Sequence, residues 1–138
     1  MRYKINSPER QVALYDYLLS RGDKWTSMEE VTDSISMYPA FFTSYYHNSW
    51  ARRLLTEDIK AINSSTSFNK VIVSGSNGIK LGKESEVLQF IRSELREIRR
   101  KLKMIWAIIR KCSRDQQITL EGEVVETFLV GKDAEQDN

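Results

Sequence analysis

Apolar residues in the first forty positions recur with the spacing of an α-helix, in two separate stretches. At the beginning of the first stretch, Ser7 is followed by Pro8, an order typical of a helix N-cap with proline at the first helical position. Gly22 provides a C-terminal stop. The pattern therefore predicts a helix between these residues, with an inward side formed by Val12, Tyr15, Leu18 and Leu19.

A short extended segment at residues 25–26 separates this helix from a second one. Ser27 and Glu30 have the spacing of a capping box, in which each side chain bonds the backbone amide of the other residue. Pro39 limits the second helix, because the residue before proline avoids the α conformation. We expect the core-facing residues of this helix to be Val31 and Ile35.

Residues 49–63 form a third amphipathic stretch. At about 100° per residue, one arc of the predicted helix carries Ala51, Leu54, Leu55, Ile59 and Ile62. The opposite side carries Ser49, Arg53, Thr56 and Lys60, and Arg52 lies beside it. Such side chains reach phosphates and base edges from a helix, although for a single helix they are more often typical of a solvated face. Asp58 lies on the apolar arc, so it requires a buried partner or a helix rotated from this arrangement.

Residues 68–73 and 79–81 are rich in β-branched and aromatic side chains, which predicts two strands. Asn77 and Gly78 between them favour a tight turn, because both residues tolerate positive φ. We expect a hairpin with a small polar tip at Ser76 and Asn77, flanked by Lys70 and Lys80. An ordinary surface hairpin has the same pattern, so this feature alone does not indicate a ligand.

Between residues 83 and 114 the apolar spacing becomes 3-4-3-4-3-4-3, which is the spacing of a heptad seam. The residues of this seam are Leu88, Ile91, Leu95, Ile98, Leu102, Ile105, Ile109 and Cys112. Such a stripe predicts a coiled coil, and leucine at position a with isoleucine at d favours tetramers over parallel dimers. Glu94 at g would face Arg99 at e of a parallel neighbour. An antiparallel copy, or the chain's own N-terminal domain, would also satisfy the stripe.

Six successive apolar residues, 104–109, widen the second half of this seam. That width suits a bundle of several helices, or a later segment that lies over it. Residues 118–130 are apolar enough to dock there, for example over Trp106 and Ile108, whereas 132–138 are expected to be disordered.

Charge is segregated along the chain, although the formal net charge is only +2. Residues 1–82 contain 10 basic and 8 acidic side chains, residues 83–114 contain 10 and 4, and residues 115–138 contain 1 and 7. The overall balance is therefore weak evidence for a nucleic-acid partner, because it averages a basic helix with an acidic tail.

Composition argues against several classes of function. His47 is the only histidine and Cys112 the only cysteine, so the chain lacks the residues for a zinc cluster or an internal disulfide. A nucleophilic dyad would have to use His47, and no paired acidic motif indicates magnesium. The glycine spacing at 75–78 is not that of a nucleotide-binding loop. We therefore expect no enzyme, no metal and no cofactor.

The same reasoning favours a cytoplasmic protein without a membrane partner. The first ten residues lack the apolar core of a signal peptide. No apolar run approaches the roughly 20 residues that a membrane-spanning helix needs. A single cysteine on an apolar seam fits a reducing compartment.

Residues 38–50 contain six of the fourteen aromatic side chains. They are Tyr38, Phe41, Phe42, Tyr45, Tyr46 and Trp50. Aromatic side chains stack on unpaired bases or line pockets, but they also fill gaps between helices. We favour the second interpretation, and keep Tyr45, Tyr46 and His47 as secondary candidates for backbone contacts.

Helix, short strand, helix, helix and hairpin follow one another over residues 5–82, and in this order the chain resembles the winged helix-turn-helix family. The resemblance rests on patterning, and the segment before Ser49 is longer than the family's tight turn. It implies a double-stranded DNA-binding module with its third helix in the major groove and its wing on the backbone. With the neighbouring basic residues, the implied contacts are Ser49, Arg52, Arg53, Thr56, Lys60, Lys70, Ser76, Asn77 and Lys80. The chain also resembles small winged-helix proteins of phages and prophages of Gram-positive bacteria.

The sequence thus predicts an α+β chain in three parts. These are a winged helix-turn-helix domain at 1–82, a coiled-coil helix at 83–114, and an acidic C-terminal segment at 115–138. The expected function is sequence-specific DNA binding by a homo-oligomer, dimer or tetramer, in transcription regulation or at a replication site. The alternative is a phage-type adaptor or modulator that binds proteins and not DNA.

Overall fold

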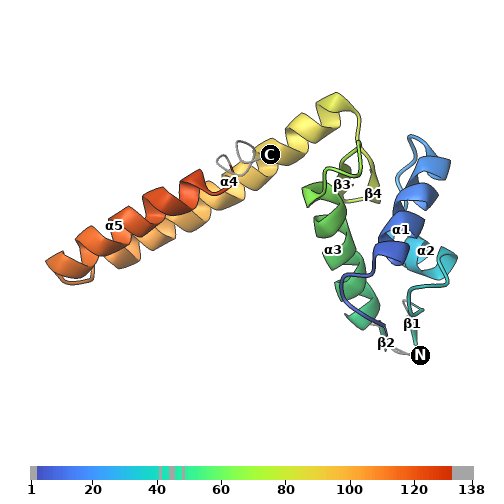
Figure 1. Ribbon diagram of the computed structural model, residues 1–138, viewed down its shortest axis with the longest axis horizontal. Helices are drawn as coiled ribbons and strands as arrows, with labels where there is room; N and C mark the ends of the chain where they lie inside the picture. Colours follow the sequence, from blue (N-terminus) through green and yellow to red (C-terminus); the bar gives the residue numbers. More distant parts are fainter. Residues whose placement is uncertain (1–2, 41, 44–45, 48, 132–138) are drawn as a thin grey trace. The chain divides into compact units, whose positions relative to one another are not determined.

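A computed structural model describes residues 3–40, 42–43, 46–47 and 49–131. It is a mixed α+β chain, which confirms the α+β part of the prediction (Figure 1). Its helices are α1 (Pro8–Arg21), α2 (Met28–Ser34), α3 (Ser49–Ser64), α4 (Glu84–Ile109) and α5 (Arg114–Leu129). Its strands are β1 (Phe42–Thr43), β2 (Tyr46–His47), β3 (Ile72–Gly75) and β4 (Gly78–Leu81). The chain divides into two compact units, Met1–Ile91 and Arg92–Asn138.

The first two helices begin at the caps that the sequence predicts. The Ser7 hydroxyl accepts a hydrogen bond from the Arg10 amide at 3.3 Å, and α1 ends at Gly22, whose φ is +62°. The Ser27 hydroxyl accepts from the Glu30 amide at 3.1 Å and so caps α2. Each hydroxyl satisfies an amide of the first turn that has no partner within the helix.

The core of the first unit lies between α1, α2, α3 and the β3–β4 hairpin. Its buried apolar residues are Leu14, Leu18, Val31, Ile35, Tyr38, Leu54, Leu55, Ile62, Ile72, Ile79 and Leu81. The predicted inward side of α1 was partly wrong, because Val12 and Leu19 are exposed and Leu14 is buried instead. Leu14 and Leu18 are four residues apart and occupy one face. Val12 and Leu19 are seven residues apart and share another face, roughly 120–140° around the helix from the first.

The hairpin pairs β3 with β4 in antiparallel register, and residues 76–77 form its two-residue loop. The first strand begins at Ile72 and not at Phe68, whose ring instead packs on Tyr15 with the ring centroids 4.9 Å apart. The two-residue loop is the predicted tip at Ser76 and Asn77. Only Gly78 of the turn residues has positive φ, at +116°.

Thr26 joins the edge of this hairpin. Its amide donates to the Ile79 carbonyl at 2.9 Å, and the Ile79 amide donates back to the Thr26 carbonyl at 2.8 Å. The extended segment that the sequence predicts at 25–26 is therefore a single β-bridge. Because Thr26 comes so close, a side chain at Gly78 would collide with the Thr26 carbonyl oxygen. The bridge thus requires both the positive φ and the missing side chain of that glycine.

Asp58 has the buried partners that its place on the apolar arc of α3 required. Arg10 donates to both of its oxygens, from Nε at 2.6 Å and from Nη2 at 2.9 Å. The Tyr38 hydroxyl donates to the Asp58 carboxylate at 2.6 Å. The predicted rotation of α3 was therefore correct, and the carboxylate links α3 to α1 and to the segment after α2.

Tyr38 and Trp50, at the two ends of the aromatic segment 38–50, favour the core-filling interpretation. Tyr38 is buried, and Trp50 is partly buried against the core. Phe42 pairs with His47 and Thr43 with Tyr46 in the short β1–β2 ladder. Phe41 and Tyr45 lie outside the described residues, so the proposed backbone contact of Tyr45 is not placed.

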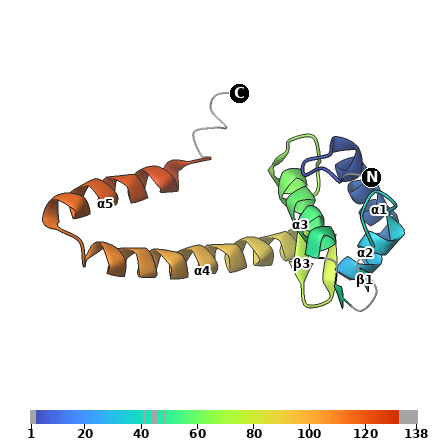
Figure 2. The ribbon, with the colours of Figure 1, turned by 90° about the horizontal axis from the view of Figure 1, so that it is seen from below.

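The second unit is an antiparallel pair of helices, in which the chain reverses direction between α4 and α5 (Figure 2). The Gln117 side-chain amide donates to the Cys112 carbonyl at 2.9 Å and so fixes the turn. Cys112, predicted as the last seam position, therefore lies beyond the end of α4. The acidic C-terminal segment is helical from Arg114 to Leu129, and the predicted disordered end lies outside the described residues. None of the described helices is long and apolar enough to span a membrane.

Candidate nucleic-acid interface

The outward face of α3 carries the first group of predicted contact residues. The inward face is fixed on α1 and α2 by the buried side chains Ala51, Leu54, Leu55, Asp58 and Ile62. With that face buried, Ser49, Arg52, Arg53 and Lys60 are exposed to solvent. The structure therefore brings four of the five predicted α3 residues to one accessible side of the helix.

Arg53 is oriented by its neighbour Trp50. The guanidinium lies 5.3 Å from the centre of the indole ring, and the ring is itself packed against the core. A cation above an aromatic face is attracted by the electron-rich ring, and a planar guanidinium keeps its donors free at the edges. Arg53 is therefore held in place on the helix surface while its N–H groups remain accessible to an acceptor such as phosphate.

Lys60 and Thr56 differ in how available their polar groups are. The Lys60 ammonium is 3.6 Å from a Glu57 carboxylate oxygen, in an exposed pair of a kind that contributes little and is easily exchanged. The Thr56 hydroxyl donates to the Arg52 carbonyl at 2.8 Å and is half-buried. Lys60 thus remains a candidate contact, whereas Thr56 is largely engaged within its own helix.

The hairpin supplies a second exposed group. Ser76 and Asn77 form the two-residue tip and are both exposed. Lys70 is exposed as well, but it precedes β3, and its backbone amide donates to the Tyr15 hydroxyl at 3.3 Å. The tip therefore presents small polar side chains and its backbone to solvent, with Lys70 on the loop that leads into the hairpin.

Lys80 is placed differently from the prediction, because its side chain is buried under two acidic residues that are themselves partly exposed. Its side chain is only 3% exposed, and its ammonium contacts Asp23 and, at 2.8 Å, Glu86. The same ammonium lies 5.4 Å from the centre of the Trp25 ring. The sequence analysis missed this because strand alternation places Lys80 on the face away from Ile79 but does not show what covers that face. We remove Lys80 from the candidate contacts.

The cluster also shifts the pKa values of its members. Hydrogen bonds from Lys80 and Lys83 hold the pKa of Asp23 below its usual range. Hydrogen bonds from the Lys80 ammonium and the Lys83 amide lower the pKa of Glu86. The pKa of Lys80 is raised, by its hydrogen bonds to Asp23 and then to Glu86. Through Glu86 these groups connect the first turn of α4 to the hairpin, and the Lys80 ammonium is engaged by both carboxylates.

Among the described residues, no group of three or more histidine, cysteine, aspartate or glutamate side chains could hold a metal ion. No family model, no curated protein and no solved structure matches the chain.

One basic surface was not singled out by the sequence analysis. Eight exposed basic side chains lie on α4 and the turn that follows it: Arg92, Arg96, Arg99, Arg100, Lys101, Lys103, Arg110 and Lys111. They occur at b, c, e, f and g positions, outside the a and d positions of the apolar seam. Only Arg100 forms an ion pair within the described part of the helix, with Glu97 at 2.8 Å. The basic residues recur every three to four positions in the sequence, which predicts a basic side of the helix. In the sequence analysis they were used only to count net charge.

The predicted seam residues are on one side of α4 but are mostly uncovered. Leu88, Ile91, Leu95, Ile98 and Ile105 are exposed, and Leu102 is half-buried. Ile109 alone is buried, at 4% exposure, next to the turn into α5. The structure therefore presents the seam as an open apolar surface within the chain.

Proposed function

We propose that this protein binds double-stranded DNA in a sequence-specific manner through a winged helix-turn-helix domain. The observation that carries the proposal is the exposed polar and basic side of α3, on which Ser49, Arg52, Arg53 and Lys60 remain accessible. Serine, arginine and lysine side chains on a helix of this kind bond base edges and phosphates in the major groove.

The order of elements in the first unit supports the proposed fold. Helix α1, the Thr26 bridge, α2, α3 and the β3–β4 hairpin follow one another, and the bridge adds Thr26 to the edge of the hairpin. In a winged helix-turn-helix domain, the last of the three helices reads the groove and the hairpin lies against the backbone. We assign these two roles to α3 and to the tip at residues 76–77.

The biological role that we propose is transcription regulation or binding at a replication site. One such module with a nearly balanced charge binds weakly, since the phosphate contacts supply most of the affinity. We therefore propose that the α4 seam joins the chain to further copies, because linked modules gain affinity through their effective concentration on DNA. The exposure of the seam residues supports this part of the proposal.

A direct test uses charge reversal on α3. Duplex binding is measured by fluorescence anisotropy at several salt concentrations, for the wild type and for the double variant Arg53→Glu/Lys60→Glu. We expect the variant to lose at least about tenfold in affinity. The slope of log affinity against log salt should become shallower by about two, because each phosphate contact contributes about 0.9.

The outcomes separate the candidate functions. Unchanged binding by the α3 variant would remove α3 as the recognition helix. No duplex binding by the wild type, even at low salt, would favour an adaptor that binds proteins.

A further inference from the structure

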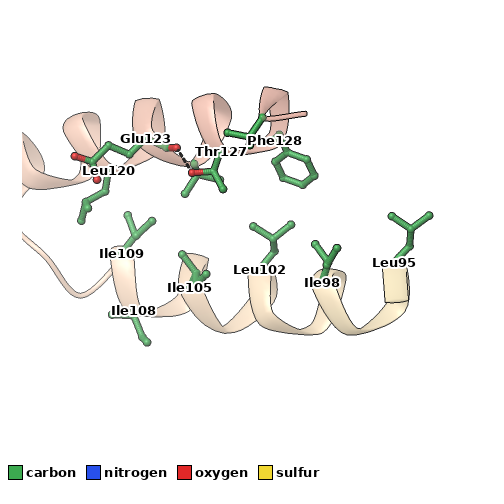
Figure 3. A pocket seen from close by; sticks show the side chains of 12 residues that line it. Leu95, Ile98, Leu102, Ile105, Ile108, Ile109, Leu120, Glu123, Thr127 and Phe128 are labelled. Carbon is green, nitrogen blue, oxygen red and sulfur yellow. Dashed lines mark hydrogen bonds between the residues drawn. The ribbon is translucent and has the colours of Figure 1, made fainter. Parts of the chain in front are cut away.

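The second unit contains an apolar groove of about 720 Å³ between α4 and α5. Figure 3 shows its lining side chains, which come from both helices and include Leu95, Leu102, Ile105, Leu120 and Phe128. A packed protein interior has few voids larger than a water molecule. The two helices therefore face each other across a space that their own side chains do not fill.

The exposed fractions show how incomplete this hairpin is. Leu95 is 56% exposed and Ile98 46%, although both line the groove. On α5, Phe128 lines the groove and is 60% exposed. Large apolar side chains on facing helices are normally buried by several neighbours. In this hairpin, only the end next to the turn is closed, where Ile109 is buried.

Helix α5 has a second apolar side in addition to the one that faces the groove. Ile118, Val125 and Leu129 are exposed and do not line the groove. At about 100° per residue they lie roughly 100° or more around α5 from Leu120 and Val124. A helix with two apolar sides at such an angle suits a four-helix bundle, in which each helix packs against two neighbours.

We propose that a second copy of this chain closes the groove, so that two α4–α5 hairpins form one four-helix bundle. The inference rests on the part of the proposed function that assigns self-association to this segment, and it is independent of DNA binding. The heptad residues support it, because leucine at a with isoleucine at d favours a core surrounded by more than two helices. Two hairpins supply four helices.

Charge determines which helices become neighbours. Residues 92–112 contain 8 basic and 2 acidic side chains, whereas α5 contains 1 basic and 4 acidic ones. If α4 of one copy lies beside α5 of the other, each basic helix has two acidic neighbours. The two α4 helices are then diagonal, which separates like charges. With both turns at the same end of the bundle, all neighbouring helices are antiparallel, as in an up-down-up-down bundle.

Exposed apolar side chains lie on both helices, among them Leu95 and Ile98 on α4 and Ile118 and Val125 on α5. They give a second copy a continuous set of apolar contacts on each helix. A two-stranded coiled coil of α4 alone would leave the second apolar side of α5 in water. The bundle covers both.

The first test measures the mass of the full chain by sedimentation, without DNA. The wild type is expected to have twice the monomer mass, and Leu95→Glu/Leu102→Glu to have half the mass of the wild type. The matched control is Arg96→Glu/Lys103→Glu, which introduces the same residue at outward positions of α4 and should keep the dimer mass. A monomeric wild type, or a seam variant that remains dimeric, would overturn the proposal.

The second test fixes the arrangement of the helices with disulfides, in a Cys112→Ser background. Two differently tagged variants, Ile108→Cys on α4 and Ile118→Cys on α5, are mixed, allowed to exchange and then oxidised. Both positions are exposed and lie near the turn of the α4–α5 hairpin. We therefore expect a disulfide between the cysteine at position 108 of one subunit and the cysteine at position 118 of the other. Leu102→Cys alone should give no covalent dimer, because the α4 helices are diagonal.

A covalent dimer of Leu102→Cys without the mixed product would overturn the bundle. That result would instead establish a two-stranded coiled coil of α4. In either case DNA binding by α3 is measured separately, so failure of the bundle is distinguishable from failure of the proposed function.

Discussion

Arg10 and Asp58 are 48 residues apart in the sequence and form a buried, two-pronged ion pair. Their side chains are 3% and 0% exposed. Burial by itself would lower the pKa of Arg10, but the hydrogen bonds and the charge of Asp58 outweigh it and the pKa is raised. The pKa of Tyr38 is raised by burial and by its hydrogen bond to Asp58, so Tyr38 remains a donor. The pair fixes the rotation of α3, and with it the side of the helix that faces outward.

Removing one member of this pair should strongly destabilise the first unit. Asp58→Ala leaves the Arg10 guanidinium buried without its counter-charge, and we expect a loss of about 3–5 kcal/mol in the free energy of unfolding. Urea unfolding monitored by tryptophan fluorescence measures this free energy of unfolding for the variant and the wild type.

The control for this prediction replaces both charges by apolar residues of similar size. Arg10→Met/Asp58→Leu should recover most of the lost stability, since no buried charge remains unpaired. Equal loss in the single and double variants would show that packing, and not the ion pair, determines stability at this position.

The sequence predicted the helices of the first unit well because their signals are local. Capping residues and apolar periodicity depend on neighbours a few positions away, as at Ser7 and Ser27. The partner of Asp58 could not be predicted, since contact with Arg10 depends on how α1 and α3 pack. Lys80 was misassigned for the same reason: its partner Asp23 is 57 residues away. The heptad spacing predicted which side of α4 is apolar. It could not predict that α5 lies next to that side, because several helix packings would cover the same apolar residues.

The cluster around Lys80 should make stability depend on acid pH. The pKa values of Asp23 and Glu86 are lowered in the folded state, from ordinary values of 3.8 and 4.5. Their contribution is therefore fully present above those values and is lost as pH falls through the lower folded-state pKa values. Thermal melts between pH 6 and pH 3 should show a difference in Tm between the wild type and Lys80→Met that shrinks below about pH 4.5. A difference that stays constant with pH would contradict this role.

Gly78 should resist substitution because of its place beside Thr26. Gly78→Ala combines strained positive φ with a collision against the Thr26 carbonyl, and we expect a loss of at least about 2 kcal/mol in unfolding free energy. Gly22→Ala is the matched control, because that glycine has positive φ but open space around it. If both variants lose the same amount, the Thr26 bridge adds nothing to the requirement for glycine.

The basic residues of α4 provide a control for charge alone. Arg96→Glu/Lys103→Glu changes the net charge as much as Arg53→Glu/Lys60→Glu does, but on the second unit. We expect it to weaken binding to every duplex by about the same factor, because phosphate contacts carry no sequence information. That factor should be smaller than the loss in the α3 variant. Sequence preference should persist in this variant and disappear in the α3 variant. Loss of preference in both would mean that α3 is not the reading element.

The most direct test of the central claim is selection of bound fragments from random and genomic DNA, followed by sequencing, with the wild type and Arg53→Glu/Lys60→Glu in parallel. The proposed function predicts that the wild type enriches one recurrent sequence motif, present as paired half-sites, and that the α3 variant does not enrich it. Recovery of fragments with no common motif, or the same motif from both proteins, would contradict sequence recognition by α3.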